Sequence, residues 1–506
     1  MLTPRQVFFI FAAVGPAASF AFAQFWAPGI WLFVGVVALV MVGLRDVTQT
    51  KRAILRQYPI LGHGRYLAEH IRPEIQQYFV ESDTNGAPFS RATRAVVYQR
   101  AKGDLDKLPF GTQLDVYAPG HEFLAHSIHP KPPAIDSRVS IGGPACTRPY
   151  SASVLNVSAM SFGALSAAAV TALSRGAAAG GFAVNTGEGG VSPYHLDGGA
   201  DLIWQIGTGY FGCRAEDGAF DPEMFATTAA LPAVKMIEIK LSQGAKPGHG
   251  GILPAAKVTP EIAEIRKVPL GTTVLSPPAH TAFSTVFELM HFVRELRMLS
   301  DGKPIGFKLC VGAASDVDLL IDAMHITGVT PDFITIDGSE GGTGAAPPEL
   351  SDFVGIPMRD AINIVNTALL QNGLRSKVRL IASGKVATGF DIVRALALGA
   401  DACGSARAMM LALGCIQARR CHTNECPVGV ATQDPNRAKA LVPSNKAGRV
   451  TGFHRETVAA FLELVGAAGC EHPSEIGLEH VSRRVDQTQV RSYAEIYGAS
   501  MSAPVR

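Results

Sequence analysis

The chain carries the segment Phe333-Ile334-Thr335-Ile336-Asp337-Gly338-Ser339-Glu340-Gly341-Gly342-Thr343-Gly344-Ala345, in which a short apolar run leads into a loop rich in glycine. A short run of β-branched and aromatic residues that ends at a glycine is typical of a buried strand. From about Pro149 onward the same order recurs, with a strand, a glycine-rich loop and then a helix. This rhythm predicts a parallel sheet built from βα units.

Eight segments fit the strand pattern. They are residues 154–157, 183–185, 202–205, 237–241, 306–311, 333–337, 378–382 and 401–404. Eight parallel strands over roughly 260 residues match the count and size of a (β/α)8 barrel, whose chemistry lies on the loops after the strands. We therefore predict an α/β protein with a TIM barrel, and a doubly wound open sheet is the alternative.

Composition limits the class of protein. The chain has 506 residues, of which 47% are hydrophobic, and its formal net charge is +2. It can therefore bury a large core and is not a disordered chain. The nearly neutral charge gives no reason to expect nucleic acid as a partner. Eight cysteines in this length do not form a disulfide scaffold, so we expect most of the chain in a reducing compartment.

We divide the chain into four parts. They are a transmembrane helical hairpin (1–45), an extension of short helices and strands (46–149), the barrel with its cysteine loop (150–435) and a short helical tail (436–506). In the extension we expect strands at 116–117 and 138–141. In the tail, helical periodicity is found at 457–467 and 473–480.

The amino-terminal part is strongly hydrophobic. Residues 7–25 and 30–44 are almost wholly apolar, and each run is close to the minimum of about 17 residues needed to span a bilayer. Basic residues flank the pair, namely Arg5 before it and Arg45, Lys51, Arg52 and Arg56 after it. The positive-inside rule then places both ends in the cytoplasm. We expect an inner-membrane anchor with the barrel facing the cytoplasm.

Two alternatives to a pair of spans remain. Ala21-Phe22-Ala23 also fits a signal-peptidase site, and cleavage there leaves one span. A hairpin buried in a soluble protein has the same composition.

Three thiols lie close together in the segment 414–430, at Cys415, Cys421 and Cys426. Zinc usually takes four protein ligands in paired short spacings, and neither gap here is of the two-residue kind. Pro427 directly follows the last cysteine, as a proline does in bacterial ferredoxin motifs. The spacing favours an iron–sulfur cluster held by three cysteines, and three buried structural thiols are the alternative.

Two loops predict a site for a phosphorylated cofactor. The seventh strand leads into Ser383-Gly384-Lys385 and the eighth into Ser405-Ala406-Arg407. Backbone amides and cations therefore gather after the last two strands, where barrels bind phosphate. The glycine-rich loop after Asp337 is suited to lie against a flat ring or a phosphate.

Lys308 lies in the middle of a predicted strand. An unpaired lysine is costly to bury, so we expect Lys308 to face an anionic partner at the barrel mouth. A reduced flavin carries such charge near N1. The alternative is an outward lysine that extends past a helix.

Polar loops after two other strands predict a substrate site. After the fourth strand, Gln243 and Lys246 are suited to grip a carboxylate, and Arg266 can supply a bidentate partner. After the second strand, Glu188 is a candidate acid, base or ammonium ligand. Ordinary surface charge is the alternative for each of these residues.

With these loops in hand, the chain resembles the FMN-binding synthase domain of the glutamate synthase family, in particular its short, stand-alone members. The stretches that carry the resemblance are 156–166, 185–190, 242–251, 276–278, 337–345 and 414–432. The resemblance implies a (β/α)8 barrel with FMN and a 3Fe-4S cluster. It also implies that ferredoxin or another small donor passes electrons through the cluster to the flavin, which reduces 2-iminoglutarate formed from 2-oxoglutarate and ammonia.

The resemblance also assigns roles by position. Cys415, Cys421 and Cys426 correspond to the cluster ligands. The residues expected to bind FMN are Ser158, Ala159, Met160, Asn185, Gln205, Lys308, Gly338, Gly341, Gly342, Thr343, Ser383, Gly384, Lys385, Ser405, Ala406 and Arg407. Those expected to act on the substrate are Glu188, Gln243, Lys246, Arg266 and, beside flavin N1, Lys308. Ile252 stands where the family typically has glutamine, which leaves the identity of the keto acid open.

Full-length members of the family begin with a glutaminase domain, for which this chain has no room. We therefore expect ammonia from solution or from a separate glutaminase subunit. The expected function is an oxidoreductase acting on CH-NH2 donors that makes glutamate or a related amino acid. A membrane-tethered electron-transfer or partner-binding subunit is the alternative, and a 2-hydroxy-acid oxidase barrel fits FMN but not the cysteines.

Overall fold

A computed structural model describes residues 2–104, 106–134 and 137–498. By its internal contacts the chain divides into two compact units, Met1–Arg91 and Ala92–Arg506. The second unit contains all the predicted strands.

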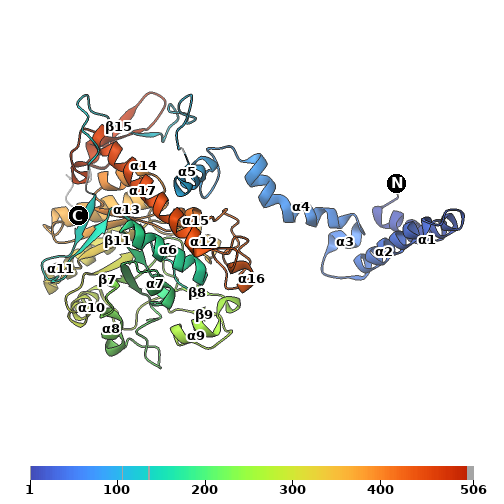
Figure 1. The fold of residues 1–506 in the computed structure, drawn as a ribbon, viewed down its shortest axis with the longest axis horizontal. Helices are drawn as coiled ribbons and strands as arrows, with labels where there is room; N and C mark the ends of the chain where they lie inside the picture. The colour runs from blue at the N-terminus through green and yellow to red at the C-terminus, as the bar shows by residue number, and fades with distance from the viewer. Residues whose placement is uncertain (1, 105, 135–136, 499–506) are drawn as a thin grey trace. The chain divides into compact units, whose positions relative to one another are not determined.

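The second unit is built around a closed barrel of eight parallel strands (Figure 1). These strands are β4 (Leu155–Val157), β5 (Val184–Asn185), β6 (Leu202–Ile206), β7 (Val234–Lys240), β10 (Ile305–Leu309), β11 (Phe333–Asp337), β12 (Arg379–Ser383) and β13 (Ala402–Ser405). Neighbours in the chain are neighbours in the barrel, and β13 closes it by pairing with β4, where Ser405 lies opposite Val157. All eight predicted strands are present, so the barrel is confirmed and the open sheet was wrong.

Helices between the strands form the outer layer. The longer ones are α6 (Ala167–Gly180), α8 (Pro222–Ala229), α10 (Val286–Leu299), α11 (Ala314–Thr327), α13 (Met358–Gln371) and α14 (Gly389–Ala397). Helix α10 is representative, because Leu289, Val293 and Leu296 recur at helical spacing on its buried side. Its start is fixed by a reciprocal hydrogen-bonded cap between Thr285 and Glu288.

Short elements occupy the loops at the carboxyl ends of the barrel strands. They are η2 (Gly187–Gly189), α7 (Pro193–Asp197), β8 (Ile252–Leu253), η3 (Ala255–Lys257), α9 (Pro260–Arg266), β9 (Val274–Leu275), α12 (Pro348–Phe353) and α15 (Arg407–Leu413). These loops follow the carboxyl ends of the strands, where barrel enzymes place their chemistry.

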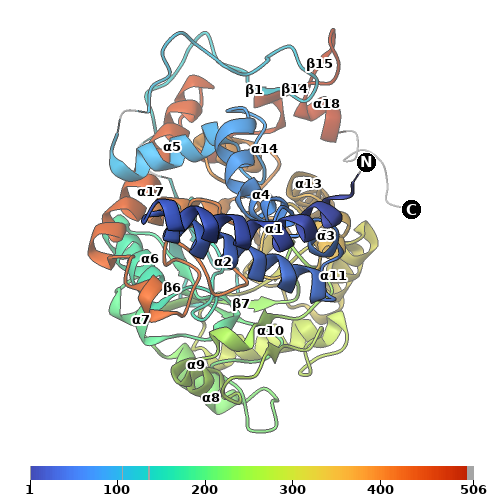
Figure 2. The ribbon, with the colours of Figure 1, turned by 90° about the vertical axis from the view of Figure 1, so that its right-hand side faces the viewer.

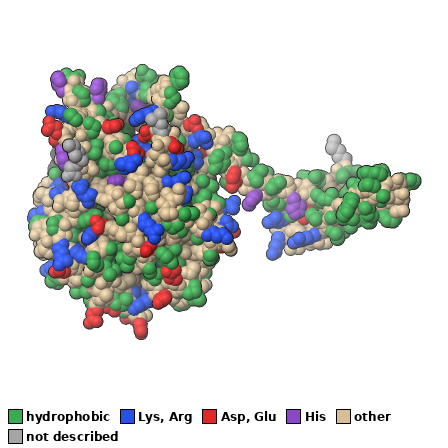
Figure 3. All heavy atoms as spheres, in the orientation of Figure 1, with side chains coloured by type: hydrophobic (Ala, Val, Ile, Leu, Met, Phe, Trp, Pro, Cys, Tyr) green, Lys and Arg blue, Asp and Glu red, His purple; other side chains and the backbone are tan. Residues whose placement is uncertain are grey.

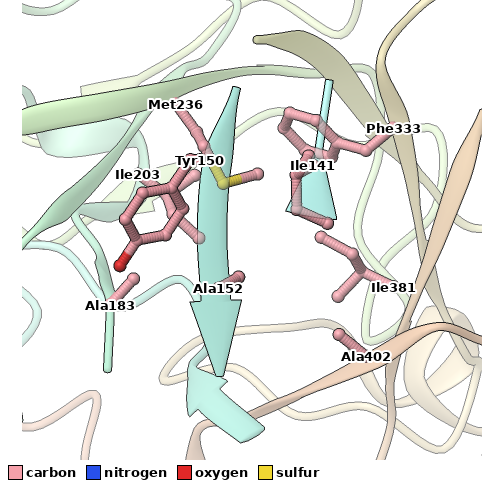
Figure 4. Packing of buried hydrophobic residues seen from close by; sticks show 9 residues of the cluster. All are labelled: Ile141, Tyr150, Ala152, Ala183, Ile203, Met236, Phe333, Ile381 and Ala402. Carbon is pink, nitrogen blue, oxygen red and sulfur yellow. The ribbon is translucent and has the colours of Figure 1, made fainter. Parts of the chain in front are cut away.

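A hairpin closes the amino-terminal end of the barrel. Strands β2 (Arg138–Ile141) and β3 (Tyr150–Ser153) pair antiparallel. Ile141 and Tyr150 of this hairpin pack against Met236 and Phe333 of the barrel strands (Figure 4). Nearby, Asp332 accepts hydrogen bonds from the backbone amides of Gly143 (2.7 Å) and Ile305 (2.8 Å). The hairpin therefore seals one end and leaves the carboxyl end for a site.

The remaining strands of the second unit differ from the prediction. Residues 116–117 form a turn, and the strand is β1 (Glu122–Leu124), which pairs with β14 (Val481–Arg484) in a small sheet completed by β15 (Val490–Ser492). Figure 2 shows this sheet together with α18 (Tyr493–Tyr497). Its strands are too short and polar to give a sequence signal, and they form because distant segments pair.

The tail is more structured than predicted. Helix α17 (Pro443–Ala467) begins well before residue 457, after the short α16 (Pro435–Ala438). Residues 473–480 contain two 3-10 turns, η4 (Pro473–Glu475) and η5 (Leu478–His480), in place of a helix. Helix α5 (Arg91–Lys102) packs on α17, where Arg100 donates a hydrogen bond to Thr457 (3.3 Å).

The first unit contains the hydrophobic hairpin, α1 (Pro4–Phe25) and α2 (Gly29–Thr48), followed by α3 (Ala53–Gln57), α4 (Gly62–Ile75) and η1 (Gln76–Val80). The two long helices pack closely at Gly43, where an added Cβ would lie 2.1 Å from the Phe8 ring. By length and composition alone, both are sufficient to cross a membrane. Hydrophobic side chains cover them, and Lys and Arg gather near α3 (Figure 3).

Replacing Asp332 with alanine tests the closed end of the barrel. The change leaves the buried Arg297, which lies 2.9 Å from Asp332, without its ionic partner. We expect the free energy of unfolding to fall by about 3–5 kcal/mol, measured by urea titration of tryptophan fluorescence. The exposed Asp352→Ala is the control, and equal stabilities of the two variants would contradict this account.

Candidate active site at the carboxyl end of the barrel

A buried ion pair lies at the barrel mouth. Glu188 is in the turn after β5, and Lys240 is the last residue of β7; their Oε1 and Nζ atoms are 3.0 Å apart. Burial opposes ionisation of Glu188. The charges of Lys240, Arg266 and Lys246 outweigh it and hold the pKa of Glu188 below its usual value. The carboxylate is therefore ionised at neutral pH.

Two further cations surround this pair. Lys246 is 2% exposed, and burial together with the charge of Lys240 lowers its pKa to about 8. Arg266, the last residue of α9, donates from Nη2 to the carbonyl of Phe162 (2.9 Å), while its buried Nε has no partner among the described residues. We call Glu188, Lys240, Lys246 and Arg266 the Glu188 cluster. It holds three basic side chains and one carboxylate, so it carries excess positive charge.

Glycines allow these charged groups to come together. A Cβ at Gly251 would lie 2.5 Å from Oε1 of Glu188, and one at Gly189 would lie 2.9 Å from Nη2 of Arg266. Both are closer than non-bonded atoms allow. The glycine-rich loops therefore let the backbone pack directly against the Glu188 cluster.

A second network lies in the barrel interior beside this cluster. Glu238 on β7 accepts hydrogen bonds from Asn185 (2.8 Å), Gln205 (2.6 Å) and Thr335 (2.6 Å). Lys308 on β10 is 5% exposed, and its Nζ is 3.4 Å from Oδ2 of Asp337. Its side chain thus lies inside the barrel.

The network keeps Lys308 charged. Burial favours the neutral amine of this lysine. The negative charges of Asp337, Glu238 and Glu188 outweigh burial and raise its pKa above the usual value. An ammonium group is therefore held at the mouth, where it can face an anion.

The loops after β11, β12 and β13 meet at one side of the mouth. Arg407 donates to the backbone carbonyl of Glu340 (2.8 Å), and its side chain lies 3.0 Å from where a Cβ of Gly342 would be. The hydroxyl of Ser383 is 3.1 Å from that of Ser158, which follows β4. Helix α15 starts after Ala406 with no side-chain cap, so backbone amides there are available to an acceptor.

Other predicted site residues are distributed around this mouth. Met160 lies against Gly187, because a Cβ there would be 3.1 Å from the Met160 amide nitrogen. Gln243 is half-buried, and its backbone carbonyl accepts from the amide of Lys246 (3.2 Å). Thr343 is exposed at the tip of its loop. The amides of Asn185 and Gln205 are already bound to Glu238, so they point into the barrel.

The three cysteines follow α15 and lie next to the glycine-rich loop. A Cβ at Gly344 would lie 3.7 Å from the Cβ of Cys421. Burial raises the pKa of Cys415 to about 12, with a smaller contribution from Cys421 and Cys426, so these thiols lie near one another. In residues 2–104, 106–134 and 137–498, no three His, Cys, Asp or Glu side chains converge as metal ligands. The cluster ligands therefore remain a prediction.

A buried lysine lies beside these thiols. Lys257 is 2% exposed and donates to the carbonyls of Ala164 (3.0 Å) and Ala431 (2.9 Å). Burial lowers its pKa to about 8, although Cys421 and Cys426 oppose that shift. The thiols are thus next to a cation that can balance the charge of thiolates.

Sequence reasoning missed Lys240, Glu238 and the groups that hold Lys240. Tyr210 accepts from the amides of Thr281 (3.1 Å) and Ala282 (3.0 Å), and its hydroxyl is 3.2 Å from Nδ1 of His280. The other ring nitrogen of His280 is 2.9 Å from the carbonyl of Lys240. Two charges at alternate positions of one buried strand were a usable signal for Glu238 and Lys240. Tyr210 and His280 gave none.

Comparison with known proteins identifies relatives. Residues 146–471 match a family model described as a conserved region in glutamate synthase. The chain is 39% identical over 497 residues to the glutamate synthase large subunit-like protein YerD of Bacillus subtilis, covering 90% of this chain and 94% of that protein. It is 36% identical over 312 residues to the archaeal-type glutamate synthase (NADPH) of Thermotoga neapolitana, covering 62% of this chain and 58% of that protein.

Among solved structures, a mandelate oxidase variant with benzaldehyde aligns with a TM-score of 0.45 at 15% identity. The alignment covers 79% of this chain and 96% of that one.

Gly251→Ala tests the close packing at the ion pair. The added methyl group would overlap the Glu188 carboxylate, so we expect a loss of about 1–3 kcal/mol in the free energy of unfolding, followed by circular dichroism in urea. Gly312→Ala is the matched control, because its Cβ would meet only Asp316 Oδ2 at an ordinary 3.5 Å. Equal stability of the two variants would show that the backbone at Gly251 is not tightly packed against the Glu188 carboxylate.

Proposed function

Because the chain belongs to the glutamate synthase family of oxidoreductases, we propose that it reductively aminates 2-oxoglutarate, or a related keto acid, through its imine. In this proposal FMN lies at the barrel mouth. A 3Fe-4S cluster on Cys415, Cys421 and Cys426 passes electrons to it from ferredoxin or another small donor.

The observation that carries the proposal is the charge of the Glu188 cluster. Three basic side chains face one carboxylate in a buried site, and unpaired buried charge is costly. A dicarboxylate such as 2-oxoglutarate brings the two negative charges that balance this excess. Within this cluster, Lys246 and Arg266 are the two cations that no described carboxylate contacts in an ion pair, so they are the expected carboxylate ligands.

The residues around the mouth are suited to hold FMN. The amides of Gly384 and Ala406 with Lys385 and Arg407 offer donors and positive charge for a phosphate, as barrels use after their last two strands. When bound and reduced by two electrons from the donor, FMN would supply the hydride that reduces the imine carbon. The other residues proposed to line its site are Ser158, Ala159, Met160, Asn185, Gln205, Gly338, Gly341, Gly342, Thr343, Ser383 and Ser405.

The proposed chemistry of this chain's own residues is to bind charge and move protons. Lys308 keeps its ammonium group beside the expected position of the anionic ring edge. Glu188 orients the ammonium of Lys240, which can give a proton to the oxygen that leaves as water when the imine forms. Gln243, half-buried on the loop after β7, is proposed to contact the same substrate. Ile252 is an apolar residue of β8, so the site is proposed to make fewer polar contacts with the keto acid at this position.

The cysteine site is suited to a cluster by its donors and its surroundings. Three thiols are the ligands that iron–sulfur clusters use, and Lys257 beside them can balance thiolate charge. The contact between Gly344 and Cys421 joins the cysteine segment to the loop proposed to cover the flavin. This contact supports the proposal that electrons pass between the cluster and the flavin.

We also propose that α1 and α2 anchor the chain in the cytoplasmic membrane with the barrel in the cytoplasm. Ammonia would be free or come from a separate glutaminase subunit. The chain spans 58% of the length of the Thermotoga relative, so that protein's whole activity is not carried over. The two apolar helices also favour a second candidate, a membrane-tethered electron-transfer subunit without amino acid synthesis.

A direct assay separates these two functions. Purified full-length protein in detergent is given 2-oxoglutarate, ammonium and reduced ferredoxin, and glutamate is measured by mass spectrometry. Glutamate formation supports the synthase. A flavin that is reduced normally and yields no amino acid from any keto acid tested would favour the electron-transfer subunit.

Lys246 should make keto acid binding dependent on pH. Its pKa of about 8 means that the ammonium group is present below that pH and is lost above it. We therefore expect KM for 2-oxoglutarate to rise as the pH passes through 8. Lys246→Gln should raise KM at pH 7 by about 30-fold, the value of a charged hydrogen bond near 2 kcal/mol, and remove this pH dependence. The exposed Lys267→Gln should retain it.

Cys421→Ser tests the cluster ligands. Loss of one thiolate should abolish the electron paramagnetic resonance signal of the oxidised 3Fe-4S cluster and lower the iron content. Cys146→Ser, a half-buried cysteine bonded to the carbonyl of Gly302, is the control. An unchanged spectrum in Cys421→Ser would refute the assignment.

A further inference from the structure

Helix α5 lies against the cysteine segment although it is far from it in sequence and precedes the region matched by the family model. The Tyr98 hydroxyl donates a hydrogen bond to the backbone carbonyl of Cys415 (2.7 Å). On its other side, α5 packs on α17, where a Cβ at Gly452 would lie 3.1 Å from the carbonyl of Arg100. Helix α5 is thus held between α17 and Cys415.

Arg94 on α5 is buried, and no described residue forms an ion pair with it. It is 6% exposed, and its Nε is a buried donor that makes no hydrogen bond in the described part of the chain. Nor does any described carboxylate form an ion pair with this guanidinium, whereas Arg100 on the same helix pairs with Asp106 at 3.0 Å. A buried cation without an anion costs several kcal/mol, so a compensating charge is expected near Arg94.

The position of Arg94 indicates where that charge comes from. Arg94 and Tyr98 are four residues apart, so they lie on the same face of α5, the face that touches Cys415. Lys257 supplies a second buried cation next to Cys421 and Cys426. Two cations therefore flank three thiols.

Metal binding would create the missing anion. Each thiol that binds iron loses its proton to solvent as the sulfur–iron bond forms, and three thiolates on a cluster leave net negative charge in a poorly solvated place. The guanidinium is matched to the loaded site.

We propose that Arg94 is a positioning residue for the cysteine site, which balances the charge of the thiolate-bound cluster while Tyr98 holds the backbone of Cys415. This inference rests on the proposed iron–sulfur function and deepens it. The reduced cluster carries one more negative charge than the oxidised one, so a nearby cation favours reduction and raises the reduction potential. Helix α5 thereby sets how readily the cluster accepts an electron.

The test is a redox titration of the cluster in full-length protein, followed by electron paramagnetic resonance. In Arg94→Gln we expect the ratio of reduced to oxidised cluster at a fixed potential to fall about tenfold, a shift of about 59 mV for one electron. Arg94→Lys keeps the charge and should restore most of the ratio. Tyr98→Phe should speed the loss of iron to a chelator at least several-fold.

Arg100→Gln is the matched control, since it removes another buried arginine from the same helix but one that is bonded to Asp106 and Thr457. It should lower stability without changing the potential.

A wild-type protein that binds no iron would overturn both the cluster and this inference. An iron-loaded Arg94→Gln with an unchanged potential, or a shift equal to that of Arg100→Gln, would overturn the inference alone. If Arg94→Gln does not fold, Arg94→Lys and Arg94→Met are titrated instead, and equal potentials in these two would overturn it.

Discussion

The buried carboxylate of Glu238 ties the inside of the barrel together. It accepts hydrogen bonds from Asn185, Gln205 and Thr335, which come from β5, β6 and β11, so a single side chain of β7 connects four strands. A carboxylate in that place is tolerable only because each of these donors reaches it. Its negative charge also helps keep Lys308 protonated. The same group thus organises the strands and sets the charge at their carboxyl ends.

Polar groups in the mouth form two regions with different roles. The Glu188 cluster has excess positive charge and is suited to an anionic substrate, whereas Lys308 and Asp337 nearly balance each other. Glycines make the first region possible, because the loops at Gly189 and Gly251 approach its charged groups too closely for any side chain. The glycine-rich composition of these loops therefore reflects packing against ions as much as conformational freedom.

The sequence predicted the barrel well because each strand is a short apolar run with a glycine-rich stop, a signal that is local. It predicted Glu188, Lys246 and Arg266 as loop charges, but not that Lys240 would pair with Glu188, because Lys240 belongs to a strand. Strand β1 was misplaced at 116–117, since Glu122–Leu124 becomes a strand only by pairing with β14. Helix α17 was predicted too short because its first turns lack a strong apolar periodicity. Local sequence signals were sufficient to predict the barrel strands and their loops. They failed where contact with a distant segment determines the local structure.

The bond between Tyr98 and Cys415 joins residues 317 positions apart, and β1 reaches β14 across a similar length, where Glu122 lies opposite Arg483. Contacts this remote form late, after the intervening chain has collapsed. During synthesis the cysteine segment emerges with no α5 beside it until the barrel between them has closed. The order of assembly therefore makes the surroundings of the three thiols complete only in a finished barrel, so that a newly made chain acquires its full thiol environment at the end of folding.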